Sequence, residues 1–197
     1  AYLRSLTTDD EEIDIDVSSA LQHMGREPWN DWWFLGDSDS TQPLGNGAGG
    51  ERRLGRLYLS YAAQKVKNKI SSAYQIATEN INTDTANIYF HIVSGMGGGT
   101  GSGTFIDMCY LLKQQYPNAH IIGYFFLPKV NADVVTDAET KNYILQNGYA
   151  AMQDLDYTMQ LAINRGAFSQ IYRDGSGLPT EWKGAPVEMC HIISNQG

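Results

Sequence analysis

The sequence is poor in cysteine and contains no long apolar run. Its two cysteines, Cys109 and Cys190, lie in apolar stretches and have no metal-ligand spacing. We therefore expect buried thiols rather than a metal site or a disulfide framework. No apolar run approaches the ~18 residues of a membrane span, and the N-terminus does not resemble a leader peptide. The expectation is a cytoplasmic protein without direct membrane insertion.

Basic residues are also scarce, because 14 Lys and Arg face 22 Asp and Glu, for a formal net charge of −8. General nucleic-acid binding needs a basic surface, so this balance argues against nucleic acid as a partner. It also disfavours attachment to an anionic membrane. A single phosphate-bearing ligand remains compatible with the charge, since backbone N–H groups bind phosphate without lysine.

The first 44 residues give few periodic signals. The acidic run TTDDEEIDID (7–16) is interpreted as a solvated face or loop, and VSSALQHMG (17–25) as a short helix that ends at a glycine. Three tryptophans at positions 29, 32 and 33 are expected to pack in a core or an interface. The role of this segment is left open.

From residue 51 onward, helical and strand patterns alternate. Helices are predicted over 51–79, 104–117 and 137–164, strands over 87–95, 120–128 and 187–194, and a glycine-rich loop over 173–186. This order is typical of an α/β fold with an open, mostly parallel sheet and helices on both faces. The loops at 95–103, 128–139 and 194–197 then leave strands at the same edge, where such sheets bind ligands.

The stretch GMGGGTGSG (95–103) has six glycines in nine residues and follows an apolar strand pattern. Glycines let a ligand approach bare backbone, and the helix expected to open near Gly103 offers unpaired N–H groups. The hydroxyls of Thr100 and Ser102 are predicted to stand at the rim of the loop as hydrogen-bond donors. The candidate phosphate-binding residues are Gly97, Gly98, Gly99, Thr100, Gly101, Ser102 and Gly103.

Two common phosphate motifs do not fit this loop. A P-loop requires a lysine after the glycines, and none follows here. The dinucleotide pattern GxGxxG is not matched in this loop. It does occur over 45–50, but that segment follows DSDSTQPL, which is not a strand pattern.

With a strand before it and a helix after it, GGGTGSG resembles the nucleotide-binding signature of the tubulin/FtsZ superfamily of GTPases, which grips the diphosphate. GNGAGG (45–50) is similar to the family's GAGxN-type loop that senses the γ-phosphate. The resemblance thus assigns Gly47, Ala48, Gly49 and Gly50 to that phosphate.

Two later segments follow the family in the same order. PKVNADVV (128–135) resembles the tubulin stretch PKVSDTVVE that passes the ribose, with a spacing that leaves Asp133, Asp137 and Glu139 as alternatives. CHIISNQ (190–196) is similar to YCIDNEA, whose asparagine reads the guanine edge. The resemblance assigns that role to Asn195, whose amide supplies a donor and an acceptor.

The resemblance covers residues 45–197 and mixes FtsZ-like and tubulin-like features, as expected of a divergent, prokaryotic tubulin-like protein. It implies a GTP-binding protein that uses GTP/GDP and Mg²⁺ and assembles into filaments. In this family an acidic loop of a neighbouring subunit completes GTP hydrolysis. We expect residues 1–197 to form one incomplete nucleotide-binding domain, with no catalytic acid assigned and no protein metal ligand.

Two other functions remain open on the sequence alone. The chain could be a nucleotide-binding interaction module that does not hydrolyse its ligand. It could also be an unrelated α/β enzyme that uses the glycine loop for another phosphorylated ligand, such as a dinucleotide.

Overall fold

The computed structural model describes Ala20, residues 48–83 and residues 85–195. The acidic run, the rest of the helix expected over 17–25 and the three tryptophans lie outside the described residues. Gly47 of the predicted γ-phosphate loop lies outside them as well.

A three-stranded parallel sheet organises the described part of the chain. Its strands are β1 (Tyr89–Gly95), β2 (His120–Phe126) and β5 (Met189–Ile193), in the spatial order β1-β2-β5. The three strand patterns are confirmed, as is the predicted α/β fold class with a parallel sheet. Parallel pairing requires crossover connections, which the helices between these strands supply.

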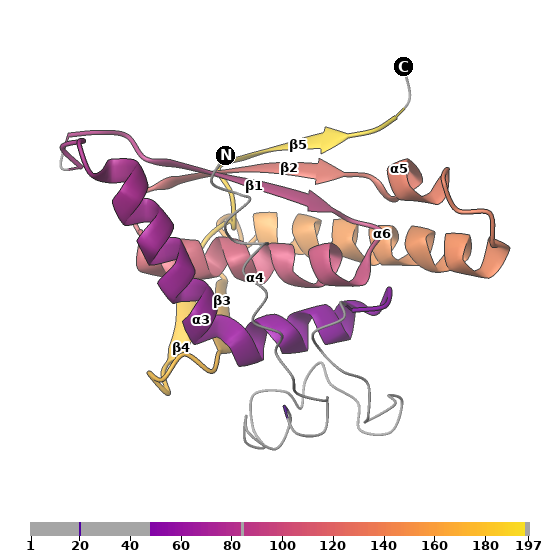
Figure 1. Ribbon diagram of the computed structural model, residues 1–197, viewed down its shortest axis with the longest axis horizontal. Coiled ribbons are helices and arrows are strands. Elements are labelled where there is room, and N and C mark those ends of the chain that lie inside the picture. The colour runs from indigo at the N-terminus through magenta and orange to yellow at the C-terminus, as the bar shows by residue number, and fades with distance from the viewer. Residues whose placement is uncertain (1–19, 21–47, 84, 196–197) are drawn as a thin grey trace.

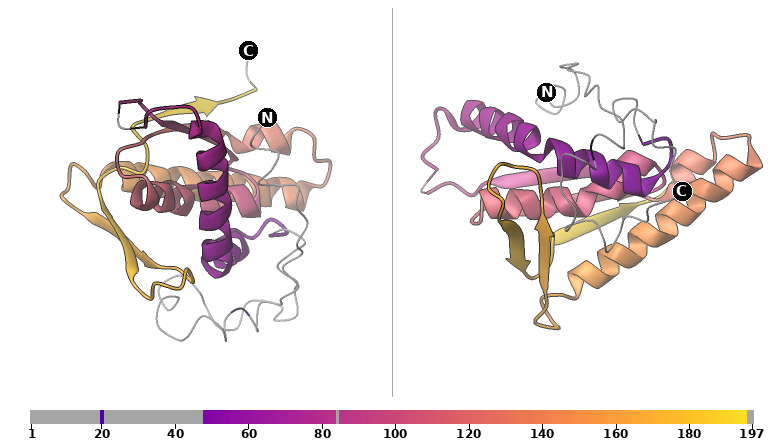
Figure 2. Two further views of the ribbon diagram at one scale, coloured as in Figure 1. Left: turned by 60° about the vertical axis from the view of Figure 1, so that its left-hand side comes forward. Right: turned by 90° about the horizontal axis from the view of Figure 1, so that it is seen from below.

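Three long helices accompany the sheet: α3 (Arg52–Thr78), α4 (Gly99–Gln115) and α6 (Ala138–Met159). The sheet lies above α4 and α6 in Figure 1, and α3 packs on the far side of α4. The right-hand view of Figure 2 shows the same arrangement from below. The other face of the sheet carries exposed Tyr89, Val93 and Met189, and no described helix covers it. Of the helices predicted on both faces, the described residues thus provide those of one face.

The core lies between the sheet and the helices, where strand residues alternate between this face and the outer face. Phe105 of α4 packs edge-on against Phe125 of β2, with ring centroids 4.9 Å apart. Leu111 of α4 and Ile121 of β2 are buried in the same hydrophobic cluster. Burying each such side chain stabilises the fold by about 1.5–3 kcal/mol, so this layer fixes α4 beneath the strands.

The structure differs from the sequence prediction in two helices. Helix α4 begins at Gly99 instead of near Gly103, so glycines form its first turns despite their low helix propensity. A short helix, α5 (Pro128–Ala132), replaces the start of the loop expected after β2. Its proline occupies the first helical turn, where a missing N–H costs nothing.

A β-hairpin was also missed. Strands β3 (Ala167–Ile171) and β4 (Pro179–Lys183) pair antiparallel, and β4 lies within the segment predicted as a glycine-rich loop. The hairpin packs on α4, because Phe168 stacks on Tyr110 with ring centroids 4.0 Å apart. Among the described residues, no helix has the length and apolar composition to cross a membrane.

Candidate functional site

The segments with predicted binding roles gather at the carboxyl edge of the sheet. Strands β1, β2 and β5 are parallel and end in register, with Gly95 opposite Phe126 and Phe126 opposite Ile193. The glycine loop and α4 follow β1, α5 follows β2, and Asn195 follows β5. The prediction that these loops share one edge is confirmed.

The N-terminus of α4 presents bare backbone at this edge. Gly98 is its N-cap residue, in extended conformation, and no side chain caps the helix. A Cβ added at Gly98 would meet nothing within 4 Å. The first-turn N–H groups have no partner within the helix and carry the positive end of its dipole. This end of α4 is therefore chemically suited to an anion, with the exposed Thr100 beside it.

The neighbouring glycines are needed for packing rather than for open space. A Cβ at Gly99 would come within 2.8 Å of the Ala48 Cβ and the Gly50 carbonyl carbon. At Gly97 it would meet Ile144 and Pro128, and at Gly101 it would meet Ser94. The Cβ positions of these three glycines therefore face neighbouring residues, and the role of their backbone in phosphate binding stays a prediction.

Ser102 does not stand at the rim as predicted, and Gly103 lies within α4 instead of at its start. Ser102 is 1% exposed, and its hydroxyl donates to the carbonyl of Gly98 one turn earlier. A Cβ at Gly103 would collide with the backbone of Arg52 in α3. Because α4 begins four residues earlier than expected, both residues face α3 or the helix itself.

A tight turn at residues 48–51 faces the glycine loop. The Glu51 N–H donates to the Ala48 carbonyl at 2.6 Å, and Gly49 and Gly50 have φ values of +52° and +90°. Two successive positive φ angles favour glycine at both positions. The Ala48 N–H donates to Thr100 Oγ1 at 3.3 Å, so the turn rests directly on the start of α4.

Asn147 of α6 also joins the two loops, and the sequence analysis did not identify it. Its Nδ2 donates to the carbonyl of Gly50 at 2.6 Å and to the carbonyl of Gly97 at 3.1 Å. The residue lies on the inward face of α6 with Gly148 and Ala151. A polar residue on such a face requires a hydrogen-bond partner, which is the signal that could have found it.

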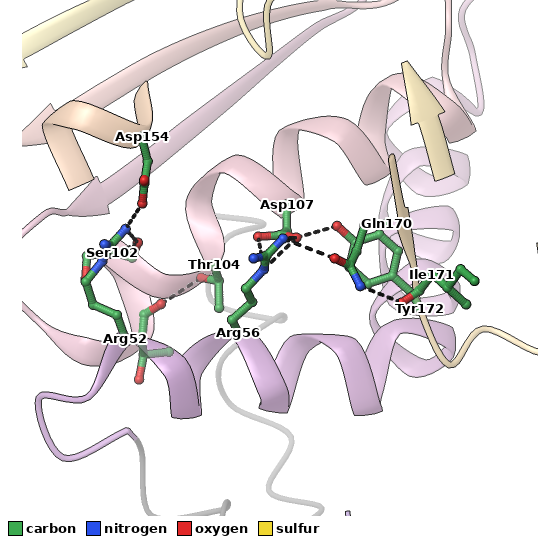
Figure 3. A network of polar contacts seen from close by, with 10 residues as sticks. Arg52, Arg56, Ser102, Thr104, Asp107, Asp154, Gln170, Ile171 and Tyr172 are labelled. Atoms are coloured by element: carbon green, nitrogen blue, oxygen red, sulfur yellow. Dashed lines mark hydrogen bonds and ion pairs between the residues drawn. The ribbon is translucent and has the colours of Figure 1, made fainter. Parts of the chain in front are cut away.

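Arg52, the first residue of α3, connects α3 to both α4 and α6. Its guanidinium donates to the Ser102 carbonyl at 3.1 Å and pairs with Asp154 of α6 at 2.6 Å (Figure 3). The start of α3 is thus held against the first turn of α4 and against α6.

The base and ribose candidates meet at the adjacent strand ends. Asn195 Nδ2 donates to Asp133 Oδ2 at 2.5 Å, and both residues are exposed. Asp137 instead caps α6, where it accepts the Thr140 N–H at 2.7 Å. Hydrogen bonds from Thr140 hold the pKa of Asp137 below its ordinary value. Glu139 lies exposed in the first turn of the same helix.

The remaining reactive side chains lie elsewhere. Cys109 is buried in α4, where burial raises the pKa of its thiol to about 12, whereas Cys190 is partly buried. His91, His120 and His191 lie in β1, β2 and β5, respectively. Across residues 48–83 and 85–195, no three His, Cys, Asp or Glu side chains form a metal-binding group.

A family match extends over nearly the whole sequence. A family model described as "Tubulin like" matches residues 4–197. The chain belongs to this tubulin-like family. No curated protein is detectably similar to it in sequence.

Two solved structures similar to this tubulin-like chain are of TubZ from one phage. A TubZ of Clostridium botulinum phage c-st with a truncated C-terminal tail is 25% identical, over 62% of this chain and 36% of that one, with a TM-score of 0.36. Another TubZ structure from this phage is 18% identical. The match covers 82% of this chain and 39% of that one, with a TM-score of 0.38. The chain thus spans less than two fifths of the length of the TubZ chains it matches.

Proposed function

We propose that this tubulin-like chain binds a guanine nucleotide at the carboxyl edge of its sheet. The observation that carries the proposal is the open backbone of Gly98 at the N-terminus of α4, faced by the turn at 48–51. In the proposal, the N–H groups of residues 98–101 hold the diphosphate and Thr100 adds its hydroxyl. Ala48, Gly49 and Gly50 contact the γ-phosphate.

The nucleoside is proposed to lie toward the ends of β2 and β5. Asn195 reads the guanine edge with its amide, and Asp133 accepts from the ribose hydroxyls. The hydrogen bond between these exposed side chains supports their placement at one site. Asp137 is a weaker ribose candidate because its carboxylate already caps α6.

Mg²⁺ would be held by phosphate oxygens and water, since the described residues offer no cluster of ligating side chains. When bound, it would offset charge on the phosphates. The chain's own contribution is positioning, through amides and hydroxyls at the carboxyl edge.

We further propose that the whole protein assembles into filaments and that a neighbouring subunit supplies the acid that completes GTP hydrolysis. Membership of the tubulin-like family supports this proposal. Hydrolysis per subunit should then rise with protein concentration. An equal rate per subunit at low and high concentration would contradict the trans arrangement.

Calorimetric titration with GTP, GDP, ATP and NAD tests the nucleotide site. We expect the guanine nucleotides to bind more tightly than ATP or NAD, and Asn195→Ala to remove most of the preference over ATP. The matched control is Asn142→Ala, an exposed asparagine of α6. Tighter binding of NAD, or equal binding of GTP and ATP by the unmodified protein, would refute the assignment.

A further inference from the structure

Two loops from separate parts of the chain are joined through one amide of α6. The Asn147 Nδ2 group carries two hydrogens and donates to two carbonyls, those of Gly50 and Gly97. Gly50 belongs to the turn before α3, and Gly97 belongs to the loop before α4. A change in the position of either loop must therefore break or bend a hydrogen bond to α6.

The packing around Asn147 keeps α6 close to the glycine loop. Gly148, the next residue, is buried against Pro128, and a Cβ there would lie 2.6 Å from the proline Cβ. Pro128 also contacts the Cβ side of Gly97. Moving α6 away from Pro128 would lose this packing. The contact therefore keeps the Asn147 amide within hydrogen-bond distance of both loops.

We propose that Asn147 is a positioning residue that couples the turn at 48–51 to the loop at 97–101 and so sets the preference for a triphosphate over a diphosphate. This inference rests on the proposed function, in which the turn meets only the terminal phosphate and the loop meets the other two. Holding the turn in its binding position then favours GTP selectively. The Gly50 contact is the shorter of the two, so the turn depends on Asn147 most directly.

The start of α3 is secured independently of Asn147. Arg52 bonds to the Ser102 carbonyl and to Asp154, and Ala48 donates to Thr100. Removal of the Asn147 amide therefore loosens the turn without detaching α3. This separation allows a variant that changes nucleotide preference while the fold persists.

The test compares Asn147→Ala with Asn142→Ala, an exposed asparagine on the same helix. Calorimetry measures the dissociation constants of GDP and of a non-hydrolysable GTP analogue for both variants and for the unmodified protein. In Asn147→Ala, we expect the ratio of GDP to GTP-analogue dissociation constants to fall roughly 5- to 20-fold, the scale of leaving a carbonyl without its donor. Asn142→Ala should leave the ratio unchanged.

A merely structural role predicts another result. In that case both nucleotides lose affinity by the same factor, and an unchanged ratio would overturn the proposal. Asn147→Ser retains one donor proton and can serve only one carbonyl, so it should shift the ratio in the same direction by less. This variant decides the question if Asn147→Ala does not fold.

Hydrogen exchange of the nucleotide-free protein gives a readout that does not depend on the ligand. Amides at 48–51 and 97–101 should exchange faster in Asn147→Ala than in Asn142→Ala. Unchanged exchange at both loops would overturn the coupling itself. An unmodified protein that binds neither nucleotide would refute the proposed function and the nucleotide role of Asn147, whatever the exchange rates show.

Discussion

Gly98 and Gly99 are adjacent in sequence but have opposite surroundings. Gly98 adopts a φ of −85°, which any residue can reach, and has open space where a Cβ would stand. Gly99 lies against Ala48, Gly50 and Glu51 of the facing turn. The two glycines therefore separate the effect of a methyl group on ligand approach from its effect on packing.

We expect Gly98→Ala to weaken nucleotide binding at least tenfold while the melting temperature stays close to that of the unmodified protein. Gly99→Ala should cost about 1–3 kcal/mol of unfolding free energy, because the added methyl overpacks the contact between the two loops. Calorimetry and urea unfolding measure the two effects. Nucleotide affinity that survives in Gly98→Ala would show that the ligand does not approach this backbone.

The sequence predicted that the glycine loop binds phosphate through its backbone, but it could not show which glycines are open to a ligand and which are packed against other residues. The strand-loop-helix context indicated an anion site, and Gly98 has the open backbone that such a site requires. The contacts of Gly97, Gly99 and Gly103 come from Pro128, the 48–51 turn and Arg52, which are distant in sequence. Asn147 was not predicted for the same reason, because its partners Gly50 and Gly97 are distant in sequence and come close to it only in the fold.

Between elements, a buried polar network attaches the hairpin to α4. Asp107 of α4 accepts from Arg56 of α3 at 3.3 Å and from the hydroxyl of Tyr172, just after β3, at 2.5 Å (Figure 3). Arg56 also donates to Gln170 of β3 at 3.2 Å. Burial and the Asp107 charge raise the pKa of Tyr172, so its hydroxyl keeps the proton that it donates.

Tyr172→Phe should lower the free energy of unfolding by about 1–3 kcal/mol, because a buried carboxylate loses one of its donors. Urea unfolding provides the measurement. Tyr157→Phe is the matched control, since Tyr157 is 68% exposed on α6, and a change within about 0.5 kcal/mol is expected there. A Tyr172→Phe variant as stable as this control would mean that the network does not hold the hairpin.

The elements with a strong apolar period were predictable from the sequence, whereas α5 and the β3–β4 hairpin were not. Helix α3 and the three parallel strands follow from apolar spacing, because each buries one face or stripe against the core. Strand β4 lies between glycines, and its sequence predicts a loop. It becomes a strand because Thr180 bonds to Gln114 at 3.0 Å and Lys113 lies over the Trp182 ring. Such tertiary contacts override a local pattern that favours turns.

Across the whole molecule, two carboxylates join distant parts of the chain to buried or half-buried lysines. Asp174 pairs with Lys67 of α3 at 2.8 Å, and Glu188 pairs with Lys113 of α4 at 2.8 Å. Burial alone would raise the pKa of Asp174, but hydrogen bonds from Lys67 and Ser176 outweigh it and hold the pKa below its ordinary value. Glu188 behaves alike, with Lys113 and the Ile121 N–H as donors.

These shifts predict that the fold loses stability in acid. A carboxyl with a lower pKa in the folded state binds its proton less readily there than in the unfolded chain. Its stabilisation is therefore complete above the ordinary pKa values of 3.8 for Asp174 and 4.5 for Glu188. It is lost as the pH falls through the lower pKa values of the folded protein.

Glu188→Gln tests this at the scale of the whole fold. Lys113 is 7% exposed, so the loss of its partner should destabilise the protein by about 1–3 kcal/mol at pH 7. The variant should also lose less further stability than the unmodified protein between pH 5 and about pH 3, because one linked proton is gone. Urea unfolding at several pH values measures both effects, with the exposed Glu181→Gln as the control. Parallel stability profiles for Glu188→Gln and the unmodified protein would show that this pair does not link the fold to pH.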